Sequence, residues 1–568
     1  MKKVLFTLSV VVLFAAAAAA QAIFPEQIEA PAVFGSTTLV MPQSPLTTQI
    51  IFIGGTDMVE TNATYGNPAA SVPAKEWHDF IGFTPDKSGE SLGWVSVNHE
   101  MVQANDNIGD GGGMTSFRIA RDPNTDTLIV LEQALEDGRQ GKFFAIDFAN
   151  TVGETGMNCG GIQSPDGRIW TAEEWFQDSN SDIIGGIRDT ADFTIKSDLA
   201  GWDGITVKKY QNLNWMVEVD PIQAKAIRKQ YNWGRQPFEG GSISKNLKRV
   251  YLGPDATPGF FGMFIADVAG DFSKGTLYAY KHDKPGYKWV PIFGGTDVFL
   301  NANQEIAAKG ATMYNRIEWT ALDPVTGDIY WTETGSDRPG RAFAAGQAAG
   351  GVHDPYHIER AKSLGFVDSL GNGNPNDPNY PNFYGSVWKY DVAKDTNYVY
   401  IEGGAGVATD KHLSNPDGLN IMLIDGKRYM VIEEDLNGRT QGRMPAGINV
   451  NSCELWLLDM EQYEYPTVDN LIRLAVTPAG AEVTGCAVLP DGKSLLINAQ
   501  HPSTSNPFPY NHSFTFAIHG FDKLSASSLT EPTIETRGAE VEAPSQYIQT
   551  QLHCLVYFST TTDAALYN

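Results

Sequence analysis

The sequence predicts an all-β protein, specifically a six-bladed β-propeller with large insertions between its strands. Three observations predict it: short apolar runs, tight turns between these runs, and a unit that recurs six times. Gly (57), Trp (12), Tyr (22) and Phe (28) are plentiful, and runs such as LGWVSV, RIWTAE and DIYWTE alternate with Asp-Gly turns. Such runs bounded by turn residues are typical of strands, and long helical periodicities are scarce.

Each recurring unit begins with one potential metal ligand, followed by an apolar strand, a polar turn and a second apolar strand that ends in polar residues. Cys159, for example, is followed by GGIQSPDGRIWTAEE. The six leading residues are Asp79, Cys159, Glu239, Glu318, Asp417 and Glu482, spaced by 80, 80, 79, 99 and 65 residues. A near-constant spacing indicates a repeat architecture, and six units that cannot each bury their own faces favour a closed ring.

In such a ring the first strand of every blade lines the central channel, so the six leading residues should meet at one end of it. Five carboxylates and a thiol cannot share a site while ionised unless a cation lies among them. Oxygen ligands favour hard cations such as calcium, whereas a thiolate favours a transition metal such as iron. The pattern therefore predicts a mixed polymetal site.

Simpler explanations exist for the individual positions. Asx turns alone would explain Asp79 and Asp417. Cys159 could instead form a disulfide, because four cysteines in an exported protein allow three pairings. Cys453 and Cys486, which both lie in strand-like runs, are the better candidates for a disulfide pair.

The ends of the chain predict its location and domain boundaries. Lys2 and Lys3 precede an apolar run that closes with Ala-Gln-Ala, so residues 1–22 are expected to be a secretory signal peptide. Residues 23–525 would form the propeller, and residues 526–568 a polar linker with a short tail. The formal net charge of −26 argues against nucleic acid or anionic membranes as partners. We expect a secreted, periplasmic or cell-surface protein with no membrane contact in its mature form.

Six short motifs, in this order along residues 75–505, are similar to those of the PhoX-type alkaline phosphatase family. They are Asn98-His99-Glu100, NCGGIQSPDGRIWTAEE, GRQPFEGG, Arg316-Ile317-Glu318-Trp319, NPDGL and EVTGCAVLPDGKSLLINAQHP. The resemblance implies a six-bladed propeller that holds an iron–calcium cluster, with Fe³⁺ and Ca²⁺ as cofactors. It also implies that this cluster hydrolyses phosphomonoesters, so the expected partner is a phosphorylated small molecule.

The resemblance assigns roles to individual residues. Cys159 would bind iron, and Arg316 would hold the substrate phosphate. Glu239, Glu318 and Glu482 would be further ligands of the cluster, whereas Glu100, Glu173 and Asp417 would bind calcium or lie just outside the ligands. Asp79 joins this set because it leads the first recurring unit. Adjacent strand residues face opposite sides, so the sequence leaves open whether Glu173 or Glu174 points inward.

Arg316 and Glu318 are the candidate catalytic residues. They lie two positions apart, so on an extended strand both side chains face the same side. A guanidinium group there can clamp a phosphate through two hydrogen bonds while Glu318 holds a metal ion. Phosphoryl transfer depends mainly on positioning and charge neutralisation, which these groups would supply. The alternative for Arg316 is an ordinary salt bridge with Glu318 or another acid.

Two other functions fit a propeller of this kind. One is a calcium-dependent lactonase or esterase, which the NPDGL stretch would suit, although such sites need few carboxylates and no cysteine. The other is a non-catalytic surface propeller whose metal ions only stabilise the ring. The phosphatase hypothesis accounts for all six leading residues and for Arg316.

Overall fold

The computed structural model describes residues 22–526, except for residues 65, 102–104, 106, 110, 182–189, 408–409 and 436–451. Contacts divide the chain into one unit that ends at Ser528 and a second unit of residues 529–568. The predicted signal peptide and C-terminal tail therefore lie outside the described residues, apart from residues 22 and 526 at their edges.

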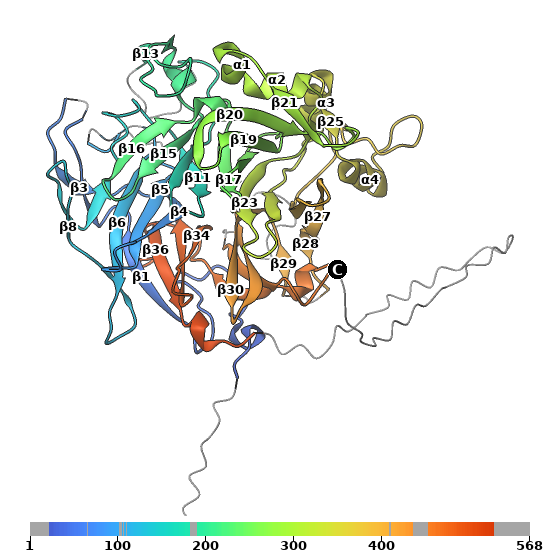
Figure 1. The fold of residues 1–568 in the computed structure, drawn as a ribbon. Coiled ribbons are helices and arrows are strands. Elements are labelled where there is room, and N and C mark those ends of the chain that lie inside the picture. Colours follow the sequence, from blue (N-terminus) through green and yellow to red (C-terminus); the bar gives the residue numbers. More distant parts are fainter. Residues whose placement is uncertain are drawn as a thin grey trace, which may run out of the picture. The chain divides into compact units, whose positions relative to one another are not determined.

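The described residues form six sheets of four or more strands, which follow one another around a centre (Figure 1). Five sheets, from the centre outward, are β11(Asn158–Gln163), β12(Ile169–Glu173), β15(Met216–Asp220), β16(Lys225–Lys229); β17(Phe238–Ile243), β18(Arg249–Pro254), β19(Gly262–Val268), β20(Asp271–Tyr280), β21(Trp289–Ile292); β23(Ile317–Leu322), β24(Ile329–Glu333), β26(Ser386–Asp391), β27(Thr396–Glu402); β30(Pro416–Ile424), β31(Lys427–Glu434), β32(Glu454–Asp459), β33(Ile472–Val476); and β34(Glu482–Val488), β35(Ser494–Gln500), β36(Phe514–His519), β1(Thr47–Ile53). The remaining sheet has seven strands, namely β4(His78–Pro85), β5(Gly93–His99), β6(Met114–Arg121), β10(Phe143–Ala145), β2(Met58–Glu60) and β3(Ser71–Pro73), with β7(Leu128–Val130) paired to β6.

The fold is an all-β propeller, as the sequence predicts, but it has five regular blades rather than six. Each regular blade is a sheet of four or five antiparallel strands. The seven-stranded sheet departs from this form because β2 and β3 precede its first strand in the chain. These strands extend its outer edge, where β2 pairs with β10 in parallel. An N-terminal segment has thus been added to this sheet.

The first strands of the six sheets contact one another in a closed cycle, in the order β4, β11, β17, β23, β30 and β34. Their approach is close: a Cβ atom at Gly160 on β11 would lie 1.6 Å from the carbonyl oxygen of Glu239 on β17, so only glycine fits there. The N-terminal strand β1 closes the ring by pairing antiparallel with β36, the last strand. Distant ends of the domain are therefore joined in one sheet.

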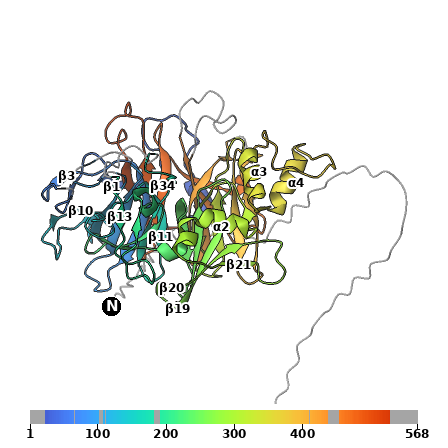
Figure 2. The same cartoon turned by 90° about the horizontal axis from the view of Figure 1, so that it is seen from above.

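The segments outside the blade strands carry the few helices, 3₁₀ turns and two-stranded sheets of the described chain. The helices are α1(Thr296–Leu300), α2(Ala302–Ala308), α3(Gly340–Ala348) and α4(Pro355–Ser363), with 3₁₀ turns η1(Pro25–Ile28), η2(Lys209–Asn212), η3(Tyr231–Trp233), η4(Val468–Asn470) and η5(Phe521–Lys523). The two-stranded sheets are β8(Gln133–Ala134) with β9(Gln140–Gly141), β13(Phe193–Thr194) with β14(Thr206–Val207), β22(Thr312–Met313) with β25(Val352–His353), and β28(Gly404–Ala405) with β29(His412–Leu413). Helices α3 and α4 lie together at one edge of the propeller (Figure 2). No helix of the described residues is long and apolar enough to cross a membrane.

Local sequence explains where α4 begins. Pro355 occupies its first turn, where a missing N–H costs nothing, and Asp354 caps it by accepting a hydrogen bond from the Tyr356 N–H at 3.0 Å.

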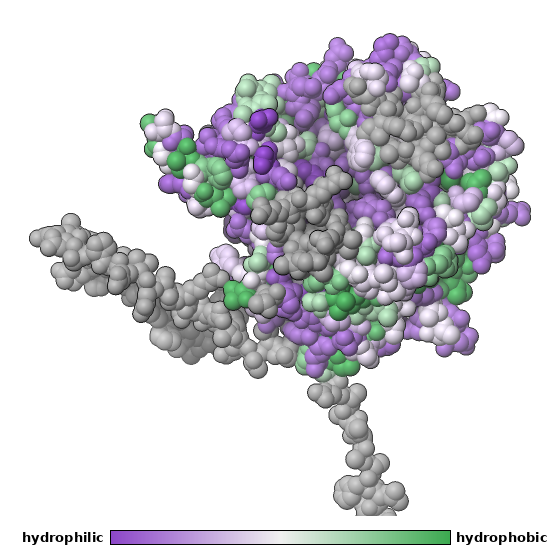
Figure 3. All heavy atoms as spheres, turned by 180° about the vertical axis from the view of Figure 1, so that it is seen from behind, coloured by the Kyte–Doolittle hydropathy of each residue, from purple (hydrophilic) through white to green (hydrophobic). Residues whose placement is uncertain are grey.

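The blades themselves pack through buried aromatic rings. Trp331 on β24 and Trp388 on β26, for example, stack with centroids 4.9 Å apart. The face in Figure 3 is mainly hydrophilic, with apolar residues in scattered groups.

Candidate metal centre

All six residues that lead the recurring units stand at the beginnings of the first strands. Five occupy the second position of their strand, and Glu482 occupies the first position of β34. In these five strands the pairing register shifts across the leading residue, as it does between Asn158 and Gly161 around Cys159. A β-bulge re-aims a side chain away from the regular pleat, so the repeated bulge turns these five leading residues toward the channel.

These strand starts surround one cavity of about 420 Å³. Its lining residues are Trp77, Glu100, Cys159, Glu174, Trp175, Glu239, Arg316, Asp417, Asp435, Glu482, Gln500 and His501. Asp79 and Glu318 adjoin it through direct contacts with Cys159 and Arg316. The structure therefore brings together every predicted site residue except Glu173.

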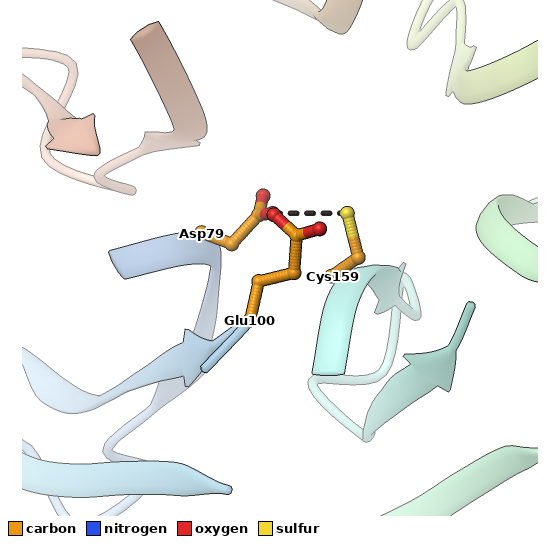
Figure 4. Close-up of side chains that lie close together, drawn as sticks. All are labelled: Asp79, Glu100 and Cys159. Atoms are coloured by element: carbon orange, nitrogen blue, oxygen red, sulfur yellow. Dashed lines mark hydrogen bonds between the residues drawn. The ribbon is translucent and has the colours of Figure 1, made fainter. Parts of the chain in front are cut away.

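Asp79, Glu100 and Cys159 point toward one another from two neighbouring sheets (Figure 4). The Cys159 thiol donates to Asp79 Oδ2 at 2.9 Å and lies 3.3 Å from Glu239 Oε1. The Trp175 indole N–H donates to Glu100 Oε1 at 3.0 Å, and the Gln500 amide donates to Asp79 Oδ2 at 3.1 Å. These contacts fix the side chains without supplying a positive charge.

Four overlapping groups in the cluster each offer three ligand atoms within 4.8 Å of one another. They are Asp79, Glu100 and Cys159; Cys159, Glu174 and Glu239; Glu239, Glu318 and Asp417; and Asp417, Asp435 and Glu482. Together they contain eight carboxylates and one thiol. This set is more acidic than the sequence predicts, because it adds Glu174 and Asp435.

Burial and mutual repulsion raise the pKa values of these acids. Burial is the largest cause at Asp79 and at Glu318, and it raises the pKa of each to about 7. The pKa of Glu239 is raised well above its usual value by burial and then by the nearby Asp417 and Glu318 carboxylates. The pKa of the Cys159 thiol is raised in the same way, by burial and by Asp79 and Glu239. Protons or bound cations must therefore neutralise the cluster.

The donor set fits metal ions on structural grounds. Asp417 Oδ1 and Glu174 Oε2 are buried and have no hydrogen-bond partner among the described residues. A buried carboxylate oxygen without a partner is costly, so such atoms indicate a ligand. A thiolate beside carboxylates suits iron, and a group of carboxylates alone suits calcium.

Arg316 reaches the cavity from the residue just before β23, not from an extended strand as the sequence predicts. Its backbone is left-handed, with φ of 64°. Its Nε and Nη2 donate to the two oxygens of Asp255 at 2.9 and 3.1 Å, and Nη2 lies 3.1 Å from Glu318 Oε1. Arg316 and Glu318 thus adjoin the same cavity, and the predicted salt bridge with an acid is also present.

A buried network holds the backbone beside Arg316. Glu333 Oε1 accepts a hydrogen bond from the Asn315 N–H at 2.7 Å and lies 2.8 Å from His357 Nε2 on α4. Burial alone would lower the pKa of His357, but the Glu333 carboxylate outweighs it and raises the pKa to about 10. The insertion that carries α4 is therefore tied to the strand that presents Arg316.

Glu173, a predicted ligand, does not face the cavity. It is fully buried and pairs with Lys229 Nζ at 2.7 Å, and it also accepts from the Thr155 hydroxyl and the Trp215 N–H. Its neighbour Glu174 lines the cavity instead. The reason is that β12 ends at Glu173, and adjacent residues at a strand end face opposite sides.

The residue directly after the second strand of a sheet is a further signal in the sequence. In four sheets an acid directly follows the second strand: Glu100 after β5, Glu174 after β12, Asp255 after β18 and Asp435 after β31. After β35 the residue is His501, which lies 3.2 Å from Glu482 Oε2. Aligning the units at their second strands would have placed Glu174, rather than Glu173, beside Glu100.

The proposed disulfide is absent. Cys159, Cys453 and Cys486 are all buried, and none of the three forms a disulfide. Cys453 and Cys486 pack in one apolar cluster with strands of two neighbouring blades, where they act as small apolar side chains. The alternative disulfide role for Cys159 is likewise excluded among the described cysteines.

A family model described as Alkaline phosphatase PhoX matches residues 145–503. The chain belongs to this family. The match includes Cys159, Glu174, Glu239, Glu318, Asp417, Asp435 and Glu482. A comparison with curated proteins finds no match.

Among solved structures, this PhoX family member is similar to Pseudomonas fluorescens PhoX in complex with vanadate, a transition state analogue. The identity is 17%, the TM-score is 0.60, and the match covers 88% of this chain and 99% of the other. This likeness supports the fold. Trypanosoma rangeli sialidase, bound to a difluorinated sugar acid, matches at 8% identity and a TM-score of 0.36 over 84% of this chain and 58% of the other. That score is too low to support any inference.

Proposed function

We propose that the protein is an exported metal-dependent phosphatase that hydrolyses phosphomonoesters with an iron–calcium cluster. The observation that carries the proposal is the convergence of eight carboxylates, the Cys159 thiol and Arg316 around one cavity in a PhoX family member. Hydrolysis adds water across the phosphate ester bond and releases an alcohol and inorganic phosphate. The substrate is thus a phosphorylated small molecule.

The two ends of the cluster suit different cations. Cys159, together with Glu174 and Glu239, offers the thiolate that favours iron. Asp417, Asp435 and Glu482 offer only oxygen, which favours calcium. When bound, such ions neutralise the charge of a phosphoryl group and act as Lewis acids. Asp79, Glu100 and Glu318 complete the proposed ligand set, and Glu174 takes the place predicted for Glu173.

Arg316 is the proposed phosphate-binding residue. Asp255 holds its Nε and Nη2, so the guanidinium plane is fixed before substrate arrives. The third nitrogen, Nη1, makes no hydrogen bond within the described part of the chain, and we assign it to a phosphate oxygen. Glu318, 3.1 Å from Nη2, links this clamp to the metal ligands.

The architecture and location are proposed as follows. The seven-stranded sheet serves as the sixth blade, because its first strand β4 lies between β34 and β11 in the cycle of first strands. Residues 1–22 act as the signal peptide for export, residues 23–525 form the catalytic domain, and residues 526–568 form the tail.

Elemental analysis of the purified protein, run with a phosphomonoester assay, tests this function. Cys159→Ala should lose iron and activity together, because its thiolate has no substitute in the cluster. Cys453→Ala is the matched control, since that cysteine is also buried and not disulfide-bonded but lies in the apolar cluster between blades. Iron with calcium, lost only in Cys159→Ala, would support the proposal. Calcium alone, with Cys159→Ala unchanged, would contradict it.

A further inference from the structure

Two tryptophans, Trp77 and Trp175, line the cavity and offer neither a metal ligand nor a positive charge for phosphate. Trp77 directly precedes β4, as Arg316 directly precedes β23. Both residues have left-handed backbones, with φ of 56° and 64°, and both stand two positions before a leading acid. Trp77 is thus the counterpart of Arg316 in another sheet.

The ring order places these counterparts on opposite sides of the cavity. In the cycle of six first strands, β4 and β23 are separated by two strands in either direction. Trp175 follows β12, whose sheet neighbours that of β4. The cavity therefore has a cationic side at Arg316 and an aromatic side at the two tryptophans.

Both tryptophans are held in place. The Trp175 N–H is bound to Glu100 Oε1, which fixes the ring while 37% of the residue stays exposed. The Trp77 backbone N–H donates to Ser513 Oγ at 2.8 Å, and its carbonyl accepts from the Glu100 backbone N–H at 3.0 Å. The Trp77 ring itself meets His501 edge-on at 5.5 Å. A left-handed backbone is costly for so bulky a residue, and such strain is found at functional sites.

We propose that Trp77 and Trp175 form a subsite that binds a flat aromatic ring in the leaving group of the phosphomonoester. This rests on the proposed phosphatase function. Fixed indole faces stack on any planar ring with little loss of entropy, and a nucleobase is the common biological example. A cavity of about 420 Å³ is in the size range that holds a ligand of several groups rather than phosphate alone. The acids around it disfavour an anionic leaving group.

The test compares substrates that share the same ester chemistry. Adenosine 5′-monophosphate and ribose 5-phosphate both carry phosphate on a ribose C5 oxygen, and only the first has a planar base. Benzyl phosphate and cyclohexylmethyl phosphate form a second pair that differs in ring planarity. In each pair the ratio of kcat/KM values is the readout, because a change in metal content affects both substrates equally.

We expect the wild-type protein to prefer the nucleotide by about tenfold, the factor that one stacked ring supplies. Trp175→Ala should bring the ratio close to one. Trp175→Phe should keep most of the preference, because it retains a ring and loses only the N–H to Glu100. Trp77→Ala and Trp77→Phe repeat the comparison. Tyr465→Ala removes an exposed aromatic residue that does not line the cavity and should leave the ratio unchanged.

The outcomes separate the subsite from the function on which it rests. Preference in the first pair alone identifies a nucleobase site, and preference in the second pair identifies a site for any flat ring. Hydrolysis of all four substrates without preference overturns the subsite and leaves the phosphatase intact. No hydrolysis of any of them overturns both. Quenching of tryptophan emission by adenosine 5′-monophosphate, absent with ribose 5-phosphate and lost in Trp175→Ala, is expected as a readout independent of turnover.

Discussion

Glu173 and Glu174 are adjacent acids with opposite surroundings, so replacing each by Gln tests the assignment of the site. Glu173 is paired with Lys229 at 2.7 Å, and both side chains are fully buried. Glu174 lines the cavity, and burial and the Glu100, Asp255 and Glu318 carboxylates raise its pKa well above the usual value. We expect Glu173→Gln to destabilise the fold and Glu174→Gln to impair metal binding.

The magnitude follows from the contacts. Glu173→Gln leaves the buried Lys229 ammonium without its counter-charge, and breaking such a pair costs about 3–5 kcal/mol. Unfolding entropy is about 2.1 cal/mol/K per residue, so for a unit of about 500 residues this lowers Tm by roughly 3–5 °C. Glu174→Gln removes one of several repelling charges, so the Tm of the metal-free protein should stay unchanged or rise.

Thermal melts of chelator-treated protein, together with metal content and activity of the untreated protein, check both expectations. Glu173→Gln should keep its metal per folded molecule while its Tm falls. Glu174→Gln should lose metal and activity while its Tm in chelator holds. The reasoning is refuted if Glu173→Gln loses metal at an unchanged Tm, or if Glu174→Gln keeps the full metal content.

Three further predictions concern charge. In metal-free protein the pKa values of Asp79 and Glu318, about 7, exceed those of the unfolded chain, so the contribution of these two groups to stability is complete below about pH 4 and is lost as the pH rises through 7. Chelated protein should therefore melt lower at pH 8 than at pH 5, and a Tm independent of pH would contradict this. The pKa of His357, raised to about 10, adds stability that is complete below pH 6.5 and is lost toward pH 10, up to several kcal/mol. The Tm difference between wild type and His357→Gln should accordingly shrink over that range, whereas a constant difference would argue against a charged pair. Asp255→Asn weakens the contact that positions Arg316, so kcat/KM for a phosphomonoester should fall about tenfold at unchanged metal content. An unchanged kcat/KM would show that Asp255 does not position Arg316 for catalysis.

The leading residues of the six units were predictable because their positions depend on local sequence. Each leading residue begins an apolar strand that is followed by a turn, and this pattern is visible at Cys159 as clearly as at Glu482. The closure of the ring was not predictable in the same way. It depends on β1 pairing with β36, which are more than 400 residues apart. The seven-stranded sheet likewise gains strands from a segment that precedes its first strand.

The sequence also could not predict which of two adjacent side chains at the end of a strand points into the channel. The sequence Glu173-Glu174 offers two equal acids, and the choice depends on where β12 ends and on Lys229 from β16 approaching one of them. Trp77 and Trp175 carried no signal for the same reason, since aromatic residues are far more often core than cavity wall.

The sequence by itself determined the strand content, the recurring unit and the six residues that begin the first strands, because these follow from residue patterns within a few positions. Only the tertiary structure decided that Glu174 and Asp435 join the cluster, that Asp255 holds Arg316, and that two tryptophans line the same cavity as Arg316. Those relations arise between blades, where the closure of the ring sets which side chains meet.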